Sequence, residues 1–178
     1  MKTWIMLLVV AFTQTALARD GGFSEEALNE VTATSRDFLE AVTEFTTEPS
    51  DASYARAISS WKELYTAWKS LAPDYADQTL QRDWTRWFAS TRIAEDDLES
   101  LITASRCPVP FSKEMIGMLS ADMQGIHTSY YLLTRHPQGV NDPVSMIALY
   151  RDQPRRCAYL RSITEMLVEK MGTLRAGS

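Results

Sequence analysis

Apolar residues recur every three or four positions along most of this chain, which is the spacing of one face of an α-helix. No segment alternates convincingly with the period of two that is typical of a half-buried strand. The first helix is predicted to begin near Ser24, which can cap it, and Pro49 marks its end. Its apolar face consists of Leu28, Val31, Ser35, Phe38, Val42 and Phe45.

Two aromatic-rich helices are expected next. The second helix stops at Pro73, and its inner face is formed by Tyr54, Ile58, Trp61, Tyr65 and Trp68. A third helix is predicted over about residues 80–103, with an inner face formed by Trp84, Trp87, Thr91, Leu98 and Leu101. Aromatic residues at this spacing can line a ligand pocket, but they more often form ordinary core.

The C-terminal part of the chain predicts further helices joined by short connections. The prolines beside Cys107 favour an extended segment, after which Ser112 can cap a fourth helix that ends near His136. The core face of that helix is formed by Ile116, Leu119, Met123, Ile126, Tyr130 and Leu133. A short helix over residues 142–150 and a last helix beginning near Pro154 follow. The pattern predicts an all-α, up-and-down antiparallel bundle of four to five helices.

The first residues have the composition of a cleaved secretory signal peptide. A basic start at Lys2 precedes an uncharged apolar run, and Ala16-Leu17-Ala18 offers a cleavage site. The run is shorter than the ~20 residues that a membrane-spanning helix needs. We therefore expect a signal peptide over residues 1–18, a single helical domain over residues 19–178 and a soluble exported protein. No cysteine lies near the cleavage site, so a lipid anchor is not expected.

The net charge and the cysteine content further limit the classes of protein to which this chain can belong. The formal net charge is −5 with no basic tract, which disfavours nucleic-acid binding because that depends on neutralising phosphates. The two cysteines of an exported chain, Cys107 and Cys157, predict one disulfide, the alternative being two separate buried thiols. Such a bond closes a loop of about 50 residues and is worth roughly 4 kcal/mol in the chain-entropy model.

His127 is the most informative polar residue because it lies within an apolar helical pattern. A buried imidazole needs a partner, so His127 either forms a structural hydrogen bond or binds a ligand. A helical metal pair of the HxxE or HxxH type requires a carboxylate or imidazole three residues later, where this chain has Tyr130. The acidic run that includes Glu95 and Asp96 is either a solvated face or a source of ligands that meet His127 across the bundle. The sequence has none of the common hydrolase, haem-attachment or phosphate-loop motifs.

Three segments, in order, resemble the imelysin family of exported bacterial helical proteins. The first is Ser60–Trp68, with its W-x6-W spacing; the second is Gly125–Leu133, which is similar to the family motif GxHxxE followed by an aromatic and two leucines; the third is Arg156–Arg161, which is similar to R-x-x-Y-L. Their order and spacing agree with the family over about residues 52–171. Gly125 and His127 match the motif, whereas Tyr130 stands where the family has glutamate.

The resemblance implies a periplasmic or outer-membrane-associated protein linked to iron uptake. It implies a metal- or haem-related ligand, with iron as the expected cofactor and His127, Tyr130, Glu95 and Asp96 as candidate ligands. It also implies a protein partner in an iron-uptake system. A phenol cannot replace a carboxylate as a general base near neutral pH, so a non-catalytic binding protein is the leading hypothesis. The alternatives are a metal-dependent peptidase and a structural or interaction module that has lost the metal site.

Overall fold

The computed structural model describes residues 24–71, 87, 91–104 and 111–176, and these residues confirm the all-α class. They form seven α-helices and one short 3₁₀ helix, more than the four to five helices expected. The elements are α1 (Glu25–Thr47), α2 (Asp51–Leu71), α4 (Glu95–Thr103), α5 (Lys113–Met118), η3 (Ala121–Met123), α6 (Gly125–Thr134), α7 (Pro143–Asp152) and α8 (Pro154–Ala176).

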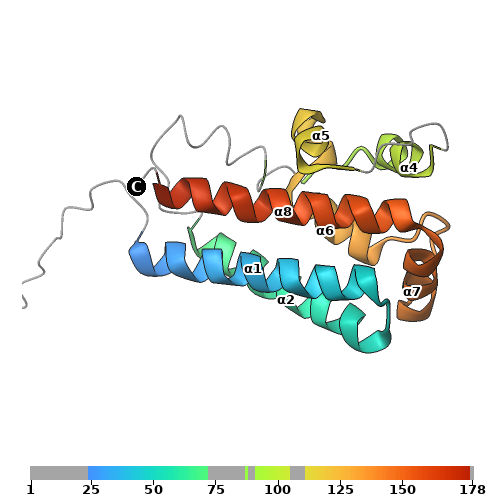
Figure 1. Ribbon diagram of the computed structural model, residues 1–178, viewed down its shortest axis with the longest axis horizontal. Coiled ribbons are helices and arrows are strands. Elements are labelled where there is room, and N and C mark those ends of the chain that lie inside the picture. Colours follow the sequence, from blue (N-terminus) through green and yellow to red (C-terminus); the bar gives the residue numbers. More distant parts are fainter. Residues whose placement is uncertain (1–23, 72–86, 88–90, 105–110, 177–178) are drawn as a thin grey trace, which may run out of the picture.

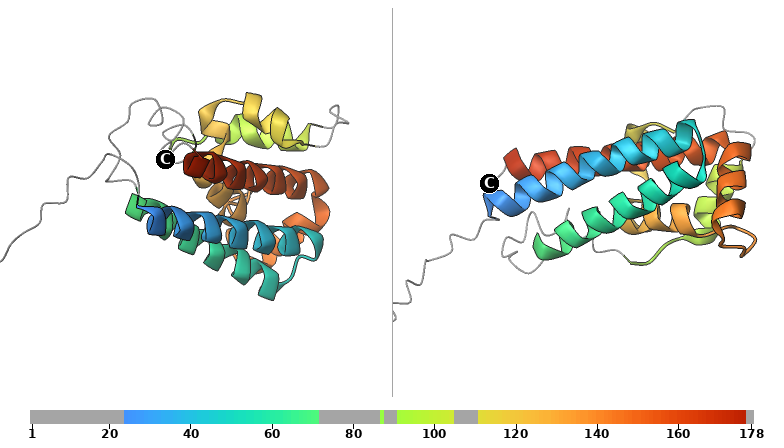
Figure 2. Two further views of the ribbon diagram at one scale, coloured as in Figure 1. Left: turned by 60° about the vertical axis from the view of Figure 1, so that its left-hand side comes forward. Right: turned by 90° about the horizontal axis from the view of Figure 1, so that it is seen from below.

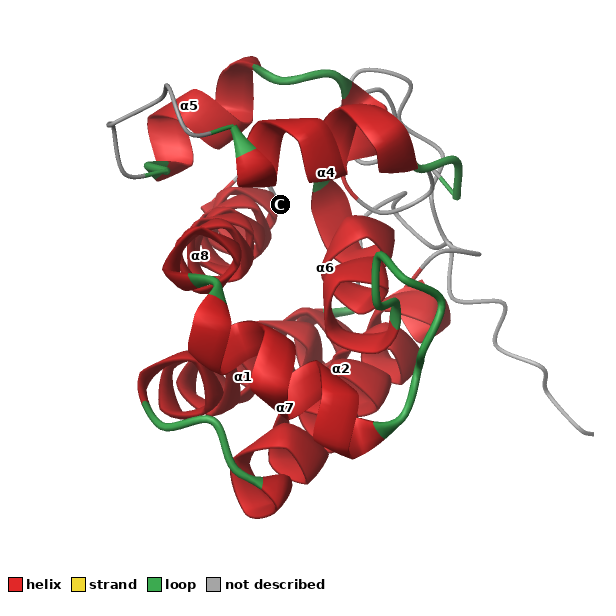
Figure 3. Ribbon diagram, turned by 90° about the vertical axis from the view of Figure 1, so that its right-hand side faces the viewer, coloured by secondary structure: helices red, strands yellow, loops and turns green. Residues whose placement is uncertain are grey.

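Four of these helices, α1, α2, α6 and α8, form the antiparallel bundle (Figure 1). The long helices α1 and α2 form a hairpin, α8 runs back along α1, and α6 lies between α2 and α8. Figure 3 shows this arrangement along the bundle axis. The short helices α4 and α5 lie over the outer side of α8, and α7 crosses one end of the bundle (Figures 1 and 2).

The α1–α2 hairpin follows directly from its sequence. Ser24 caps α1 by accepting a hydrogen bond from the amide of Ala27, and the predicted apolar face of α1 is buried against the core. At the start of α2, Ser50 and Ser53 each accept a hydrogen bond from the other's backbone amide. This reciprocal pairing satisfies amides that a helix leaves without internal partners. The turn over residues 48–50 is therefore specified by local chemistry.

The predicted fourth helix is interrupted, and this is the main correction to the sequence-based fold. It is divided into α5, η3 and α6, with extended backbone at Leu119, Ser120 and Gln124. Gly125 then has a φ of 86°, in the region that favours glycine. Its backbone lies against residue 87, because a Cβ atom built there would be 2.1 Å from the carbonyl oxygen of Trp87. The close approach requires glycine at the position where α6 begins.

The predicted third helix also differs in its described part. Residues 91–94 are not helical and Thr91 is exposed, so the predicted helix is not continuous and its last described part is α4, which begins at Glu95. Trp87 and Leu98 are buried as expected, whereas Trp84 lies outside the described residues. Tyr130, expected on the core face of the fourth helix, is 39% exposed.

Two predictions fall on residues that the structure does not describe. The predicted signal peptide lies outside the described residues, and so does Cys107. Its expected disulfide partner, Cys157, is a buried free thiol, and the disulfide stays a prediction. Within the described residues, none of the helices has the length and apolar character needed to cross a bilayer.

Replacing Gly125 with alanine should strongly destabilise the fold. The added Cβ atom would overlap the Trp87 carbonyl and would also force a left-handed backbone on a residue that resists it. We expect a loss of at least about 2 kcal/mol in the free energy of unfolding, measured by urea denaturation. Gly139→Ala is the matched control, because Gly139 also has a positive φ of 78° but its added Cβ atom meets nothing within 4 Å. Equal losses in the two variants would contradict the role of the close approach.

Candidate functional site

The three segments that resemble one family meet around α6. Facing it, α2 presents three aromatic rings at helical spacing, Trp61, Tyr65 and Trp68, which we call the aromatic ladder. Trp61 stacks on Tyr65 with ring centroids 4.9 Å apart, and Tyr65 lies 5.4 Å from Trp68. Both tryptophans are buried. The ladder forms one wall against which the motif residues of α6 pack.

His127 and Tyr130 both face this ladder from α6. The His127 ring makes edge contacts with Tyr65 at 5.6 Å and with Trp68 at 6.3 Å between ring centroids. Tyr130 packs on Trp61 at 4.2 Å between centroids. The i, i+3 spacing puts the two side chains on the same side of the helix. His127 is half-buried, whereas Tyr130 reaches the surface, so solvent has access to the edge of this pair.

The position of α6 is fixed by hydrogen bonds from aromatic side chains of other helices to its backbone and to that of η3, just before it. At the N-terminal end, the indole of Trp61 donates to the carbonyl of Ile126 in α6 at 2.9 Å, and the Tyr159 hydroxyl donates to that of Met123 in η3 at 2.7 Å. At its C-terminal end, the Tyr54 and Tyr150 hydroxyls donate to the carbonyls of residues 133 and 132 at 2.9 and 3.0 Å. These late carbonyls have no acceptor role left within the helix. The motif is therefore presented at a fixed depth and rotation.

A second polar group lies on the other side of α6, where α4 meets the start of α8. The Arg156 side chain is fully buried, pairs with the Glu99 carboxylate, and donates from Nε to Gln153 at 3.2 Å. Next to it, Arg155 donates to the backbone carbonyls of residues 101 and 102 at the end of α4. Arg155 and Arg156 thus hold α4 against α8. Arg156 does so through a buried ion pair, and Arg155 through hydrogen bonds to the last carbonyls of α4.

Tyr131 lies beside this ion pair. Burial, together with the negative charges of Glu99 and Glu95, raises the pKa of Tyr131 to about 12, although the positive charge of Arg156 acts in the opposite direction. Burial also raises the pKa values of Tyr150 and Tyr159. These phenols therefore stay neutral across the physiological range and act as hydrogen-bond donors rather than as charged groups.

The four candidate ligands lie in two separate places. His127 and Tyr130 lie together on the ladder side of α6, while Glu95 and Asp96 are exposed in the first turn of α4. The acidic residue of α4 that turns inward is Glu99, and its partner is Arg156. Within the described part of the chain, no cluster of three or more His, Cys, Asp or Glu residues could hold a metal ion. The metal site stays a prediction, with two side-chain donors on α6.

Sequence reasoning missed the buried role of Arg156 and the donor role of the tyrosines. A signal for Arg156 was available, because it lies four residues before Leu160 on the apolar face of the last helix. An arginine at such a position predicts a buried acidic partner. The identity of that partner depends on the tertiary fold. The targets of Tyr150 and Tyr159 are backbone atoms and leave no trace in the sequence.

Comparison with protein families supports the resemblance. The model of the family described as imelysin matches residues 25–177, which include all three segments discussed above. No curated protein and no solved structure matches the chain significantly.

Breaking the buried ion pair should cost far more than breaking an exposed one. Arg156→Met leaves the Glu99 carboxylate without its partner, so we expect a loss of about 3 kcal/mol in the free energy of unfolding. Arg56→Met is the control, because Arg56 pairs with Glu40 and Glu44 at the surface, and its loss should be much smaller. The double variant Glu99→Leu/Arg156→Met should recover part of the loss. A double variant no more stable than Arg156→Met would argue against an uncompensated charge as the cause.

The raised pKa of Tyr131 predicts alkaline instability. The unfolded chain releases this proton near pH 10, whereas the folded protein holds it until about pH 12. Between these values the folded state binds more protons, so its stability falls as the pH rises. Urea denaturation at several pH values above 9 should show this fall, and Tyr131→Phe should make it shallower. Identical pH slopes for the variant and the parent protein would refute the assignment.

Proposed function

The chain belongs to the imelysin family, and from this membership we propose that it is an exported, non-catalytic helical protein of bacterial iron physiology. In this proposal it acts in the periplasm after cleavage of its signal peptide and binds a metal- or haem-related ligand or a protein partner. The observation that carries the proposal is the environment of position 130, where a surface-accessible tyrosine packs on Trp61 beside His127.

The chemistry of this position argues against hydrolysis. A metal-dependent peptidase needs a group that takes a proton from water near neutral pH, and a carboxylate at position 130 could do so. The phenol of Tyr130 cannot serve as that base. His127 and Tyr130 are in addition engaged in ring contacts with the aromatic ladder. A binding role uses the same side chains without requiring a base.

The sharpest form of the proposal is ferric iron bound by His127 and Tyr130, with an acidic residue from another helix completing the site. A phenolate oxygen is a hard donor that suits ferric iron, and imidazole is a common iron ligand. The two donors share one face of α6 and reach solvent at Tyr130, through which an ion can enter.

Titration with ferric and ferrous salts tests this form directly. We expect saturable ferric binding with a visible phenolate-to-iron absorption band, weaker by at least about tenfold in His127→Ala and without the band in Tyr130→Phe. Tyr131→Phe is the matched control, since it removes a hydroxyl one residue further along the same helix, beside Glu99 rather than the ladder. Absence of saturable binding, or equal binding by the His127→Ala variant, would remove the metal claim.

A structural or interaction module is the second candidate, and the ring contacts of His127 and Tyr130 favour it. In that case the parent protein binds no metal, whereas Tyr130→Glu restores the family motif and creates affinity. Tight binding by the parent would exclude this candidate. Cleavage of an unfolded protein with added zinc, at a rate above that of His127→Ala, would instead revive the peptidase.

A further inference from the structure

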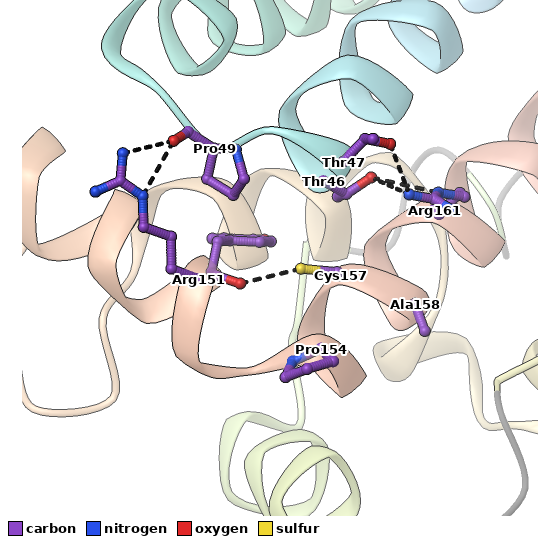
Figure 4. A pocket seen from close by; sticks show the side chains of 9 residues that line it. Thr46, Thr47, Pro49, Arg151, Pro154, Cys157, Ala158 and Arg161 are labelled. Carbon is purple, nitrogen blue, oxygen red and sulfur yellow. Dashed lines mark hydrogen bonds between the residues drawn. The ribbon is translucent and has the colours of Figure 1, made fainter.

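A cavity separate from the motif lies where the end of α1 meets α7 and the start of α8. Its volume is about 430 Å³, which is within the range of small-molecule sites. Its walls include Thr46, Thr47, Arg151, Pro154, Cys157 and Arg161. Figure 4 shows the guanidinium groups of Arg151 and Arg161 on opposite sides of this group of residues, with Cys157 between them.

Arg161 is held in place by neutral oxygens. Its Nε and Nη2 atoms donate to the hydroxyl of Thr46 at 3.3 and 2.8 Å, and Nη2 also donates to that of Thr47 at 3.3 Å. Both threonines in turn donate to carbonyls of α1, Thr46 to residue 42 and Thr47 to residue 43, each at 2.7 Å. The guanidinium is oriented by this chain of bonds while its charge is not neutralised.

Arg151 is restrained in the same manner. Its Nε and Nη2 atoms donate to the carbonyl of Pro49 at 3.2 and 2.8 Å (Figure 4). Among the described residues, no carboxylate lies within ion-pair distance of Arg151 or Arg161, although the chain is acidic overall. Two preoriented cations thus border one cavity and have only neutral acceptors.

The remaining lining adds no opposing formal charge. Cys157 donates to the Tyr150 carbonyl, and burial raises the pKa of its thiol, against the smaller opposite effect of Arg161. The thiol is therefore neutral at physiological pH. Glu165, one turn beyond Arg161, lines a neighbouring cavity of about 470 Å³ that shares Arg161 and Ala158 with the first. Helix ends contribute partial charges of both signs, positive at the start of α8 and negative at the ends of α1 and α7.

We propose that this cavity binds a small organic acid with two carboxylates, one directed to Arg151 and the other to Arg161. Guanidinium groups bind carboxylates through paired, charge-assisted hydrogen bonds, and a ligand of this kind supplies the charge that both arginines lack. The placement of the two cations on opposite sides favours two separated anionic groups over one. This inference does not depend on the ferric site, since no residue of α6 lines the cavity.

Calorimetric titration with succinate at low ionic strength tests the proposal, with acetate and inorganic phosphate as competing probes. We expect saturable succinate binding, at least about tenfold tighter than that of either other anion, and weakened by at least about tenfold in Arg151→Gln and Arg161→Gln. Arg161→Lys keeps the charge but loses the paired geometry, so its affinity should be intermediate.

Two further variants keep the test decisive. Arg56→Gln removes the same charge from a surface remote from the cavity and should leave succinate binding unchanged. Ala158→Leu keeps both arginines and adds bulk to the wall that the two cavities share, so it should weaken binding even if an arginine variant fails to fold. No succinate binding by the parent protein, equal or tighter binding of acetate or phosphate, or unaltered succinate binding in folded Arg161→Gln or in Ala158→Leu would each overturn the proposal.

Discussion

The backbone of α6 and of η3, just before it, receives hydrogen bonds from aromatic side chains of three other helices, and the rest of the arrangement depends on this. A ten-residue apolar helix leaves several terminal carbonyls without internal partners, and burying them unpaired would be costly. Tyr54 of α2 and Tyr150 of α7 donate to two of these carbonyls. At the other end, Trp61 of α2 donates to the carbonyl of Ile126 in the first turn of α6, and Tyr159 of α8 donates to that of Met123 in η3. The donors belong to the long helices α2 and α8 and to α7 at one end of the bundle. Sliding α6 along the bundle or rotating it would therefore break several hydrogen bonds at once.

This constraint explains why the three family segments occur together. Trp61 in the first segment donates to Ile126 at the beginning of the second, which carries His127, and Tyr159 in the third donates to Met123 just before it. The tryptophan also provides the surface on which Tyr130 packs. Gly125 completes the arrangement, because it allows the first residue of α6 to lie against the carbonyl of Trp87. The motif is therefore a packing unit as well as a candidate binding site.

The sequence predicts the helical class and the buried faces well, because each long stripe has the helical period and a local cap, as Ser24 does for α1. It fails at the break between α5 and α6, where the pattern of apolar residues continues but the backbone turns. The break ends at Gly125, whose close contact with residue 87 is tertiary, and no local rule contains it. The same limit applies to the candidate site: His127 and Tyr130 could be selected from the motif, whereas the pairing of Glu99 with Arg156 is tertiary.

The arginines near the start of α8 differ in the groups that balance their positive charges. Arg156 is fully buried, and a buried guanidinium is tolerated only with a close carboxylate, which Glu99 provides. Arg155 is directed to the terminal carbonyls of α4, where the helix dipole favours a cation. Arg161 lies near solvent and is oriented by threonine hydroxyls, so water screens the charge that no described carboxylate neutralises. A structural cation would gain more from an acidic neighbour, and the chain has more acidic than basic residues to supply one. Orientation without neutralisation is the arrangement expected of a group that meets its counter-charge from outside the fold.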